Sequence, residues 1–327
     1  MTVGTEPDRR SLGMFLRRRR VLAPAVAVAV ALSALLVPGS SAVGADPKQY
    51  VALGDSYAAG PLIPMMEQPW GCLKSTNNYP KLLAKRLGLT LKDATCSGAQ
   101  TDDMWHPQGV TPTPNPAQFD RLSATTGLVT LQIGGNDIGF GSIAEACGSA
   151  AVQQQSCREQ FTRADGSDEL EARIAETLPK VVEVVDGIQA RSPGAVVYLL
   201  GYPSIFRLGP VASCPAMGVG EADAQYLRGV QEKLNGMIAQ AAATAGATYL
   251  DIYGPSAGRT ACDLPALRWV EPLVPVNAAA PIHPNLNGML GVSDLVERAV
   301  AGGADPSTDV ELPAGVGGLV PAVPSPF

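Results

Sequence analysis

The stretch Tyr50-Val51-Ala52-Leu53-Gly54-Asp55-Ser56-Tyr57 determines how the rest of this chain is interpreted. Its first half is apolar and its second half has a turn sequence, as in a buried parallel strand that leaves a sheet. Two more clusters follow apolar segments in the same way: Ser97-Gly98 comes after 89–96, and Gly134-Gly135-Asn136-Asp137 comes after 128–133. Open α/β folds bind ligands at the edge where their parallel strands end. We therefore predict that the three clusters lie together.

Strand and helix patterns alternate along the remaining sequence. Further strands are predicted at 195–200 and 247–252, and helices at 78–87, 168–190, 222–245 and 285–300. Pro179 is expected to kink the second of these helices. This order predicts an α/β protein, a three-layer α/β/α sandwich with a central, mostly parallel sheet. Two long stretches without a pattern, 107–118 and 259–281, are predicted to be loops beside the site.

The first 45 residues have the pattern of an export signal. Arg17 to Arg20 form a basic segment, Val21 to Val37 are mostly apolar, and Val43-Gly44-Ala45 supplies small residues for cleavage before Asp46. A single membrane anchor is the alternative, although seventeen residues are at the short limit for a span. We expect a secreted, extracellular protein with no stable membrane span after cleavage.

Charge and composition limit the partners of the mature chain. The whole chain has 24 Lys and Arg against 30 Asp and Glu; six of the former and two of the latter lie in residues 1–45, which leaves 18 against 28, a net charge of −10. An acidic protein does not attract nucleic acid or anionic lipid, so neutral esters fit better as partners. Residues 46–302 are expected to form one domain, and the segment 303–327, rich in Pro and Gly, to be disordered.

Six cysteines follow the predicted signal. An even number in an exported chain predicts three disulfides, for which fifteen pairings exist. A metal site is the alternative, but no pair has the two-to-four-residue spacing of zinc ligands, so no metal is expected. The cysteines are Cys72, Cys96, Cys147, Cys157, Cys214 and Cys262.

The clusters contain the groups that acyl transfer requires. Ser56 supplies a nucleophile at the end of a strand, and His283, in Ile282-His283-Pro284-Asn285, supplies a general base, because imidazole has a pKa suited to exchange the serine proton near neutral pH. Gly98 and Asn136 are candidate oxyanion donors. The other histidine of the mature chain, His106, is interpreted as a surface or pocket-wall residue.

In their types and order, these clusters resemble the motifs of the SGNH (GDSL) hydrolase family over about residues 50–300. The resemblance implies a flavodoxin-like fold and a secreted serine ester hydrolase, lipase- or esterase-like, that works through an acyl-enzyme. It assigns Ser56 as nucleophile and His283 as base, with an oxyanion hole made by Ser56, Gly98 and Asn136. No cofactor is implied, and a monomer is expected.

The sequence departs from the family pattern three residues before the histidine. Many relatives have an aspartate there, whereas this chain has Ala280. The chain resembles the actinobacterial secreted branch, which implies a main-chain carbonyl at Ala280 as the orienting group and the pairs Cys72–Cys96, Cys147–Cys157 and Cys214–Cys262. A displaced carboxylate is the alternative; the candidates are Asp251, Asp263 and Glu271.

Other functions and roles are compatible with these residues. A carbohydrate or polysaccharide acetylesterase, or an inactive secreted binding module of the same fold, is compatible with the same motifs, because a fold does not determine a substrate. Four aromatic residues near the clusters are candidates for an acyl pocket or for ordinary packing: Tyr57, Trp70, Trp105 and Trp269.

Overall fold

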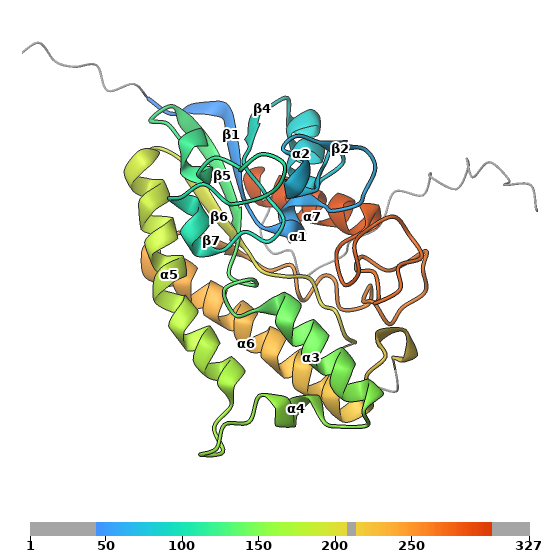
Figure 1. The fold of residues 1–327 in the computed structure, drawn as a ribbon. Coiled ribbons are helices and arrows are strands. Elements are labelled where there is room, and N and C mark those ends of the chain that lie inside the picture. The colour runs from blue at the N-terminus through green and yellow to red at the C-terminus, as the bar shows by residue number, and fades with distance from the viewer. Residues whose placement is uncertain (1–43, 208–213, 303–327) are drawn as a thin grey trace, which may run out of the picture. The chain divides into compact units, whose positions relative to one another are not determined.

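The computed structural model describes residues 44–207 and 214–302 (Figure 1). The expected signal sequence up to residue 43 and the expected tail at 303–327 lie outside the described residues. Within them, no helix has the length and apolar character needed to cross a membrane. The main elements are β1 Asp46–Gly54, α1 Ser56–Ala59, β2 Met66–Glu67, β3 Lys74–Ser75, α2 Tyr79–Leu87, β4 Thr90–Asp93, β5 Thr126–Gln132, α3 Phe140–Val152, α4 Cys157–Gln160, α5 Glu169–Arg191, β6 Val196–Leu200, α6 Glu221–Ala245, β7 Thr248–Leu250 and α7 Leu286–Val300. Short 3₁₀ helices lie at Trp70–Cys72 (η1), Thr101–Met104 (η2), Gln118–Arg121 (η3) and Pro215–Met217 (η4).

Five strands form a parallel sheet in the order β4-β1-β5-β6-β7. From β1 the chain goes first to β4 on one side and then returns to β5 on the other. The strand order therefore reverses between β1 and β5, which makes this position a topological switch point. Ligands of doubly wound folds bind outside the carboxyl ends of the strands at such a point. The predicted parallel sheet is confirmed.

Helices cover both faces of this sheet, as the three-layer prediction requires (Figure 1). Val51 and Leu53 of β1 belong to a buried cluster with α5 and α6, whereas Tyr50 and Ala52 belong to a second cluster with α2 and α7. Successive side chains of a strand point to opposite faces. Because both faces are buried, the strand is a continuous apolar run without a polar alternation.

The predicted helices and strands are present, with ends within a few residues of those expected. Asn78 caps α2 by accepting the Lys81 N–H, and Asp168 caps α5 in the same way. Pro179 lies inside α5. Three features were not predicted from the sequence: α3, which is rich in Gly, Ala and Ser, and α4 and the short β2–β3 hairpin, which are only a few residues long.

Three disulfides join Cys72 to Cys96, Cys147 to Cys157, and Cys214 to Cys262. This is the pairing that the family resemblance implied, and no free cysteine is present in the described residues. The bridges close loops of very different length, with sequence separations of 24, 10 and 48 residues.

We expect the longest of these loops to contribute most to stability. A disulfide restricts the unfolded chain more when it closes a longer loop, so the variant Cys214→Ala/Cys262→Ala should lose roughly 1 kcal/mol more than Cys147→Ala/Cys157→Ala. Urea unfolding of the two variants measures the difference. An equal loss, or a larger loss for the short loop, would contradict this expectation.

Candidate active site

The turn after β1 places Ser56 at the start of α1. Gly54 has φ of 146°, and a Cβ on it would lie 2.5 Å from the Gln132 carbonyl oxygen, so the position requires glycine. Asp55 then caps α1, since its side chain accepts the Tyr57 N–H at 2.9 Å. The Ser56 hydroxyl therefore lies at the carboxyl edge of the sheet.

His283 contacts this serine directly. Its Nε2 lies 2.8 Å from Ser56 Oγ, and its Nδ1 lies 2.7 Å from the Pro281 carbonyl oxygen. A carbonyl only accepts, so Nδ1 carries the proton and Nε2 presents a lone pair to the serine hydroxyl. This is the geometry that a general base needs before the serine attacks.

The orienting carbonyl belongs to Pro281, so the assignment to Ala280 is corrected. The Ala280 carbonyl accepts the His283 backbone N–H at 3.2 Å instead. Ile282, between the carbonyl and the histidine, has φ of 58°, and this turn brings the Pro281 oxygen to the ring. A left-handed conformation is unusual for a β-branched residue and was not foreseeable from its sequence.

Aromatic rings enclose the imidazole. The His283 ring lies 5.1 Å from that of Tyr57 and 5.9 Å from that of Phe140, measured between centroids. The Tyr57 hydroxyl donates to the Ile282 carbonyl at 2.6 Å, which ties the serine turn to the histidine loop. Burial lowers the pKa of His283 below its usual 6.5, while the bond to Pro281 raises it less.

Asn136 and Gly98 lie on adjoining loops. The Asn136 side-chain amide donates one N–H to the Ala99 carbonyl at 2.9 Å, which leaves its second N–H available. Gly98 has φ of 81°, a conformation that glycine adopts readily. In the described part of the chain, the backbone N–H groups of Ser56 and Gly98 have no protein acceptor. Asn136 lines the same pocket as Ser56.

Polar side chains join these two loops. Asp137 accepts from both the backbone N–H and the hydroxyl of Thr101. The Gln100 amide donates to the Asn136 carbonyl at 3.0 Å. Asp137 therefore holds the loops together through hydrogen bonds.

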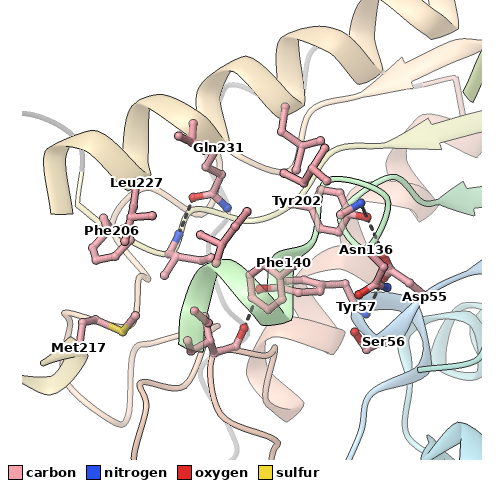
Figure 2. A pocket seen from close by; sticks show the side chains of 18 residues that line it. Asp55, Ser56, Tyr57, Asn136, Phe140, Tyr202, Phe206, Met217, Leu227 and Gln231 are labelled. Carbon is pink, nitrogen blue, oxygen red and sulfur yellow. Dashed lines mark hydrogen bonds between the residues drawn. The ribbon is translucent and has the colours of Figure 1, made fainter. Parts of the chain in front are cut away.

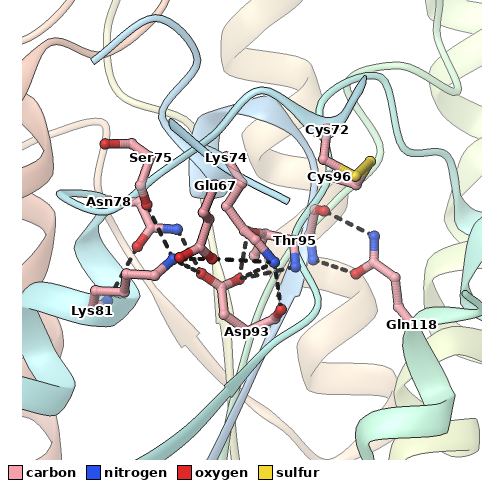
Figure 3. Close-up of polar contacts among 11 residues, drawn as sticks. Glu67, Cys72, Lys74, Ser75, Asn78, Lys81, Asp93, Thr95, Cys96 and Gln118 are labelled. Atoms are coloured by element: carbon pink, nitrogen blue, oxygen red, sulfur yellow. Dashed lines mark hydrogen bonds and ion pairs between the residues drawn. A yellow bond between two sulfur atoms is a disulfide. The ribbon is translucent and has the colours of Figure 1, made fainter. Parts of the chain in front are cut away.

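A partly buried charge cluster supports the loop that carries Gly98 (Figure 3). Lys81 Nζ pairs with Asp93 at 2.7 Å and with Glu67 at 2.9 Å, and the buried Lys74 ammonium donates to the Asp93 carbonyl at 2.7 Å. Burial raises the pKa of Asp93, but the two lysines outweigh burial and leave that pKa below its usual range. Next to the cluster, the Cys72–Cys96 disulfide fixes the start of the loop.

Tyr202 is a buried site residue that the sequence analysis missed. Its hydroxyl donates to Asp55 Oδ2 at 2.5 Å and accepts the Gly135 N–H at 2.9 Å. The sequence feature that could have indicated Tyr202 as a site residue is its position just after the strand at 196–200. Burial raises the pKa of Asp55 to about 7, although the bonds from Tyr202 and the Tyr57 N–H lower it. Asp55 ionises near pH 3.8 in the unfolded chain but only near pH 7 in the folded protein. Its contribution to the free energy of unfolding therefore decreases as the pH rises from 3.8 towards about 7.

None of the three candidate carboxylates contacts His283 in the described residues. Asp251 accepts the N–H groups of Tyr253 and Gly254. Asp263 bonds to Thr260 and Arg207. Glu271 is fully buried and accepts from the side chains of Asn277 and Asn285.

Glu271 supports the histidine loop without touching the imidazole. Its backbone N–H donates to the His283 carbonyl at 2.9 Å, and its Oε1 accepts from Asn285 at 2.6 Å. Although burial raises the pKa of Glu271, hydrogen bonds from Asn277, Asn285 and backbone N–H groups leave it below the usual value. The carboxylate therefore fixes the turn that begins α7.

A mostly apolar pocket opens beside Ser56 (Figure 2). It encloses about 750 Å³, including space open to solvent. Figure 2 shows Ser56 at one end and Phe206, Met217 and Leu227 at the other. Side chains of α3, α6, η4 and the segment after β6 form its walls.

The remaining candidates have ordinary positions. Of the four aromatic residues, Tyr57 lines the pocket, whereas Trp269 is fully buried in the core, Trp105 packs on Phe119 and Trp70 is half exposed. The side chain of His106 is 68% exposed and lies 3.7 Å from Asp102, as expected for a surface histidine. The described residues contain no group of three His, Cys, Asp or Glu side chains placed to hold a metal.

Comparison with known proteins identifies the family. The model of the GDSL-like Lipase/Acylhydrolase family matches residues 52–289. The chain belongs to this family. Lipase 2 of Streptomyces coelicolor is 39% identical, with 83% of this chain and 93% of the relative covered. A lipase of Streptomyces rimosus is 33% identical, with 84% and 95% covered.

Solved structures agree with this assignment. The extracellular lipase of Streptomyces rimosus has a TM-score of 0.65 at 29% identity and covers 77% of this chain and 99% of its own. Phospholipase A1 of Streptomyces albidoflavus NA297 has a TM-score of 0.63 at 27% identity, with 77% and 98% covered. This member of the GDSL-like family is a carboxylic ester hydrolase in the actinobacterial lipase and esterase branch.

The lowered pKa of His283 predicts the acid limb of the pH profile. The imidazole must be neutral to accept a proton, so kcat/KM for a neutral ester should fall with a midpoint below pH 6.5. Rates measured between about pH 4 and pH 8 test this. A midpoint at or above about pH 7 would contradict the expectation.

Because Asp251 and Asp263 do not contact His283 in the described part of the chain, we expect substitution of either carboxylate to affect the rate far less than substitution of the histidine. Asp251→Asn and Asp263→Asn should each keep the rate within about tenfold, or ~1.4 kcal/mol of barrier, because neither side chain touches His283. His283→Ala should cost several orders of magnitude in kcat. A thousandfold loss in either folded Asn variant would show that a carboxylate acts on the histidine.

Proposed function

We propose that this ester hydrolase works through a Ser56–His283 dyad and an acyl-enzyme. The observation that carries the proposal is the 2.8 Å contact from Ser56 Oγ to His283 Nε2, with Nδ1 occupied by the Pro281 carbonyl. A neutral carbonyl holds the tautomer as an aspartate would, but it stabilises the imidazolium less. The aromatic enclosure by Tyr57 and Phe140 limits the rotation of the ring.

In the first half-reaction Ser56 Oγ attacks the ester carbonyl carbon while its proton moves to His283 Nε2. The tetrahedral intermediate then breaks its bond to the alcohol oxygen, which takes the proton from Nε2. In the second half-reaction His283 accepts a proton from water, the resulting hydroxide attacks the acyl carbon, and the proton returns to Ser56 Oγ as the carboxylic acid leaves.

Three donors stabilise the developing oxyanion in this proposal. They are the backbone N–H groups of Ser56 and Gly98, which have no acceptor within the described residues, and the free N–H of the Asn136 amide. Each such donor can contribute ~3 kcal/mol to lowering the barrier. The hydrogen bonds between Thr101 and Asp137 keep the two loops in fixed relation.

The substrate that we propose is an ester with a long acyl chain. The pocket extends from Ser56 to Phe206, Met217 and Leu227, which form its far end (Figure 2). An acetyl group would leave most of this apolar surface unused, whereas each buried CH₂ of a longer chain contributes ~0.8 kcal/mol. The pocket therefore favours a lipase or long-chain esterase over an acetylesterase.

Export completes the proposal. The segment 1–45 has the pattern of a cleaved signal, the three disulfides suit an oxidising compartment, and the similar lipase of Streptomyces rimosus is an extracellular protein. We propose that the protein acts outside the cell.

Replacing the nucleophile is the direct test of the mechanism. Ser56→Ala should abolish ester hydrolysis and labelling by a fluorophosphonate while the protein stays folded, because the Ser56 hydroxyl is the group that bonds to His283 Nε2 and, in this proposal, forms the acyl-enzyme. Circular dichroism controls for folding. Turnover above a few per cent in the folded variant, or a labelled serine elsewhere, would refute the assignment.

A chain-length series tests the substrate. Hydrolysis of p-nitrophenyl esters from acetate to palmitate should rise with chain length. Leu227→Trp should narrow the far end of the pocket and lower the rate on palmitate by about tenfold, with little effect on butyrate. The matched variant Leu227→Ala widens the same place and should keep palmitate hydrolysis. Equal losses on both esters in Leu227→Trp would contradict the pocket assignment.

A further inference from the structure

One hydroxyl joins the two turns on which the proposed chemistry depends. Tyr202 Oη donates to Asp55 Oδ2 at 2.5 Å and accepts the Gly135 N–H at 2.9 Å (Figure 2). Asp55 directly precedes Ser56, and Gly135 directly precedes Asn136. Tyr202 therefore spans the switch point between β1 and β5.

The surroundings hold this tyrosine in one place. Its backbone N–H donates to Asn235 Oδ1 at 2.7 Å, and its carbonyl accepts from Asn235 Nδ2 at 3.1 Å, so α6 fixes the main chain on both sides of the side chain. The ring meets the edge of Tyr57 at a centroid distance of 5.0 Å. Only 4% of Tyr202 is exposed.

The glycine pair before Asn136 fits this arrangement. A Cβ on Gly135 would lie 3.0 Å from Tyr202 Oη, closer than side chains normally approach. Glycine at this position therefore lets the hydroxyl reach the backbone N–H. Burial also raises the pKa of Tyr202 well above its usual value, so the phenol is neutral and keeps its proton for Asp55.

We propose that Tyr202 is a positioning residue for ester hydrolysis, whose hydroxyl sets the separation between Ser56 and the Asn136 amide. The proposal rests on the proposed roles of those two residues. The Tyr202 hydroxyl donates its hydrogen bond to Asp55, whose position is fixed. The same hydroxyl accepts the hydrogen bond of the Gly135 N–H and thereby fixes the position of that backbone group. A displacement of about 1 Å in a reacting group can cost 100-fold in rate, so a link of this kind affects the transition state more than the bound substrate.

The test is Tyr202→Phe, which removes the hydroxyl and keeps the ring. We expect kcat for p-nitrophenyl butyrate to fall by about 10- to 100-fold while KM changes by less than about threefold. Tyr198→Phe is the matched control, because Tyr198 is also buried and its hydroxyl also donates a hydrogen bond, in this case to the Ala299 carbonyl, away from the site. That control should keep kcat, although it also loses a buried hydrogen bond.

Gly135→Ala is a second variant that perturbs the same bond from the other side. It should lower kcat in the same way, and it keeps the proposal testable if Tyr202→Phe fails to fold. Unchanged kcat in a folded Tyr202→Phe, or a change in KM alone, would overturn the proposal and leave Tyr202 as a pocket wall.

Labelling by a fluorophosphonate separates this proposal from the mechanism itself. Ser56 should still be labelled in Tyr202→Phe, at a reduced rate, because the nucleophile and its base are intact. If instead Ser56→Ala keeps its activity, the proposed function fails, whatever the result for Tyr202.

Discussion

The parallel pairing of β1 with β4 on one side and β5 on the other is the constraint on which the site depends. Tyr50 lies opposite Leu91 of β4 and Leu128 of β5, so the three strands run in register and end at the same edge. Their following turns are those of Ser56, Gly98 and Asn136. The sheet thus brings these turns close together, and side-chain hydrogen bonds such as that between Thr101 and Asp137 then fix their relative positions.

The histidine reaches the site differently, because it follows a long irregular loop and not a strand of the sheet. Its position depends on bonds between separate segments: the Tyr57 hydroxyl to the Ile282 carbonyl, the Glu271 N–H to the His283 carbonyl, and the Ala280 N–H to the Pro61 carbonyl. The sheet thus positions the proposed nucleophile and oxyanion donors, and loop contacts position the proposed base. Packing of Tyr57 against both the histidine and Tyr202 connects the two parts.

Much of this could be predicted from the sequence because the information is local. A buried parallel strand is an apolar run that ends in a turn, which located β1 and β5, and apolar residues at helical spacing located α2 and α5, whose starts the structure shows to be capped by Asn78 and Asp168. The orienting carbonyl could not be found in this way. Its identity depends on the φ of Ile282, which the surrounding contacts set against the preference of a β-branched residue. Tyr202 was missed because its role appears only when β1, β5 and β6 lie side by side.

The conformation of Ile282 has a consequence for how such a protein can change over time. A β-branched residue held in the left-handed region costs of order 1–3 kcal/mol, and here that cost falls on the residue that presents the Pro281 carbonyl to the histidine. Selection for thermal resistance alone would therefore favour glycine or a relaxed backbone at this position, and the proposed base, His283, would then be held less firmly. At this loop, a change that relieves backbone strain would act against the proposed catalytic geometry.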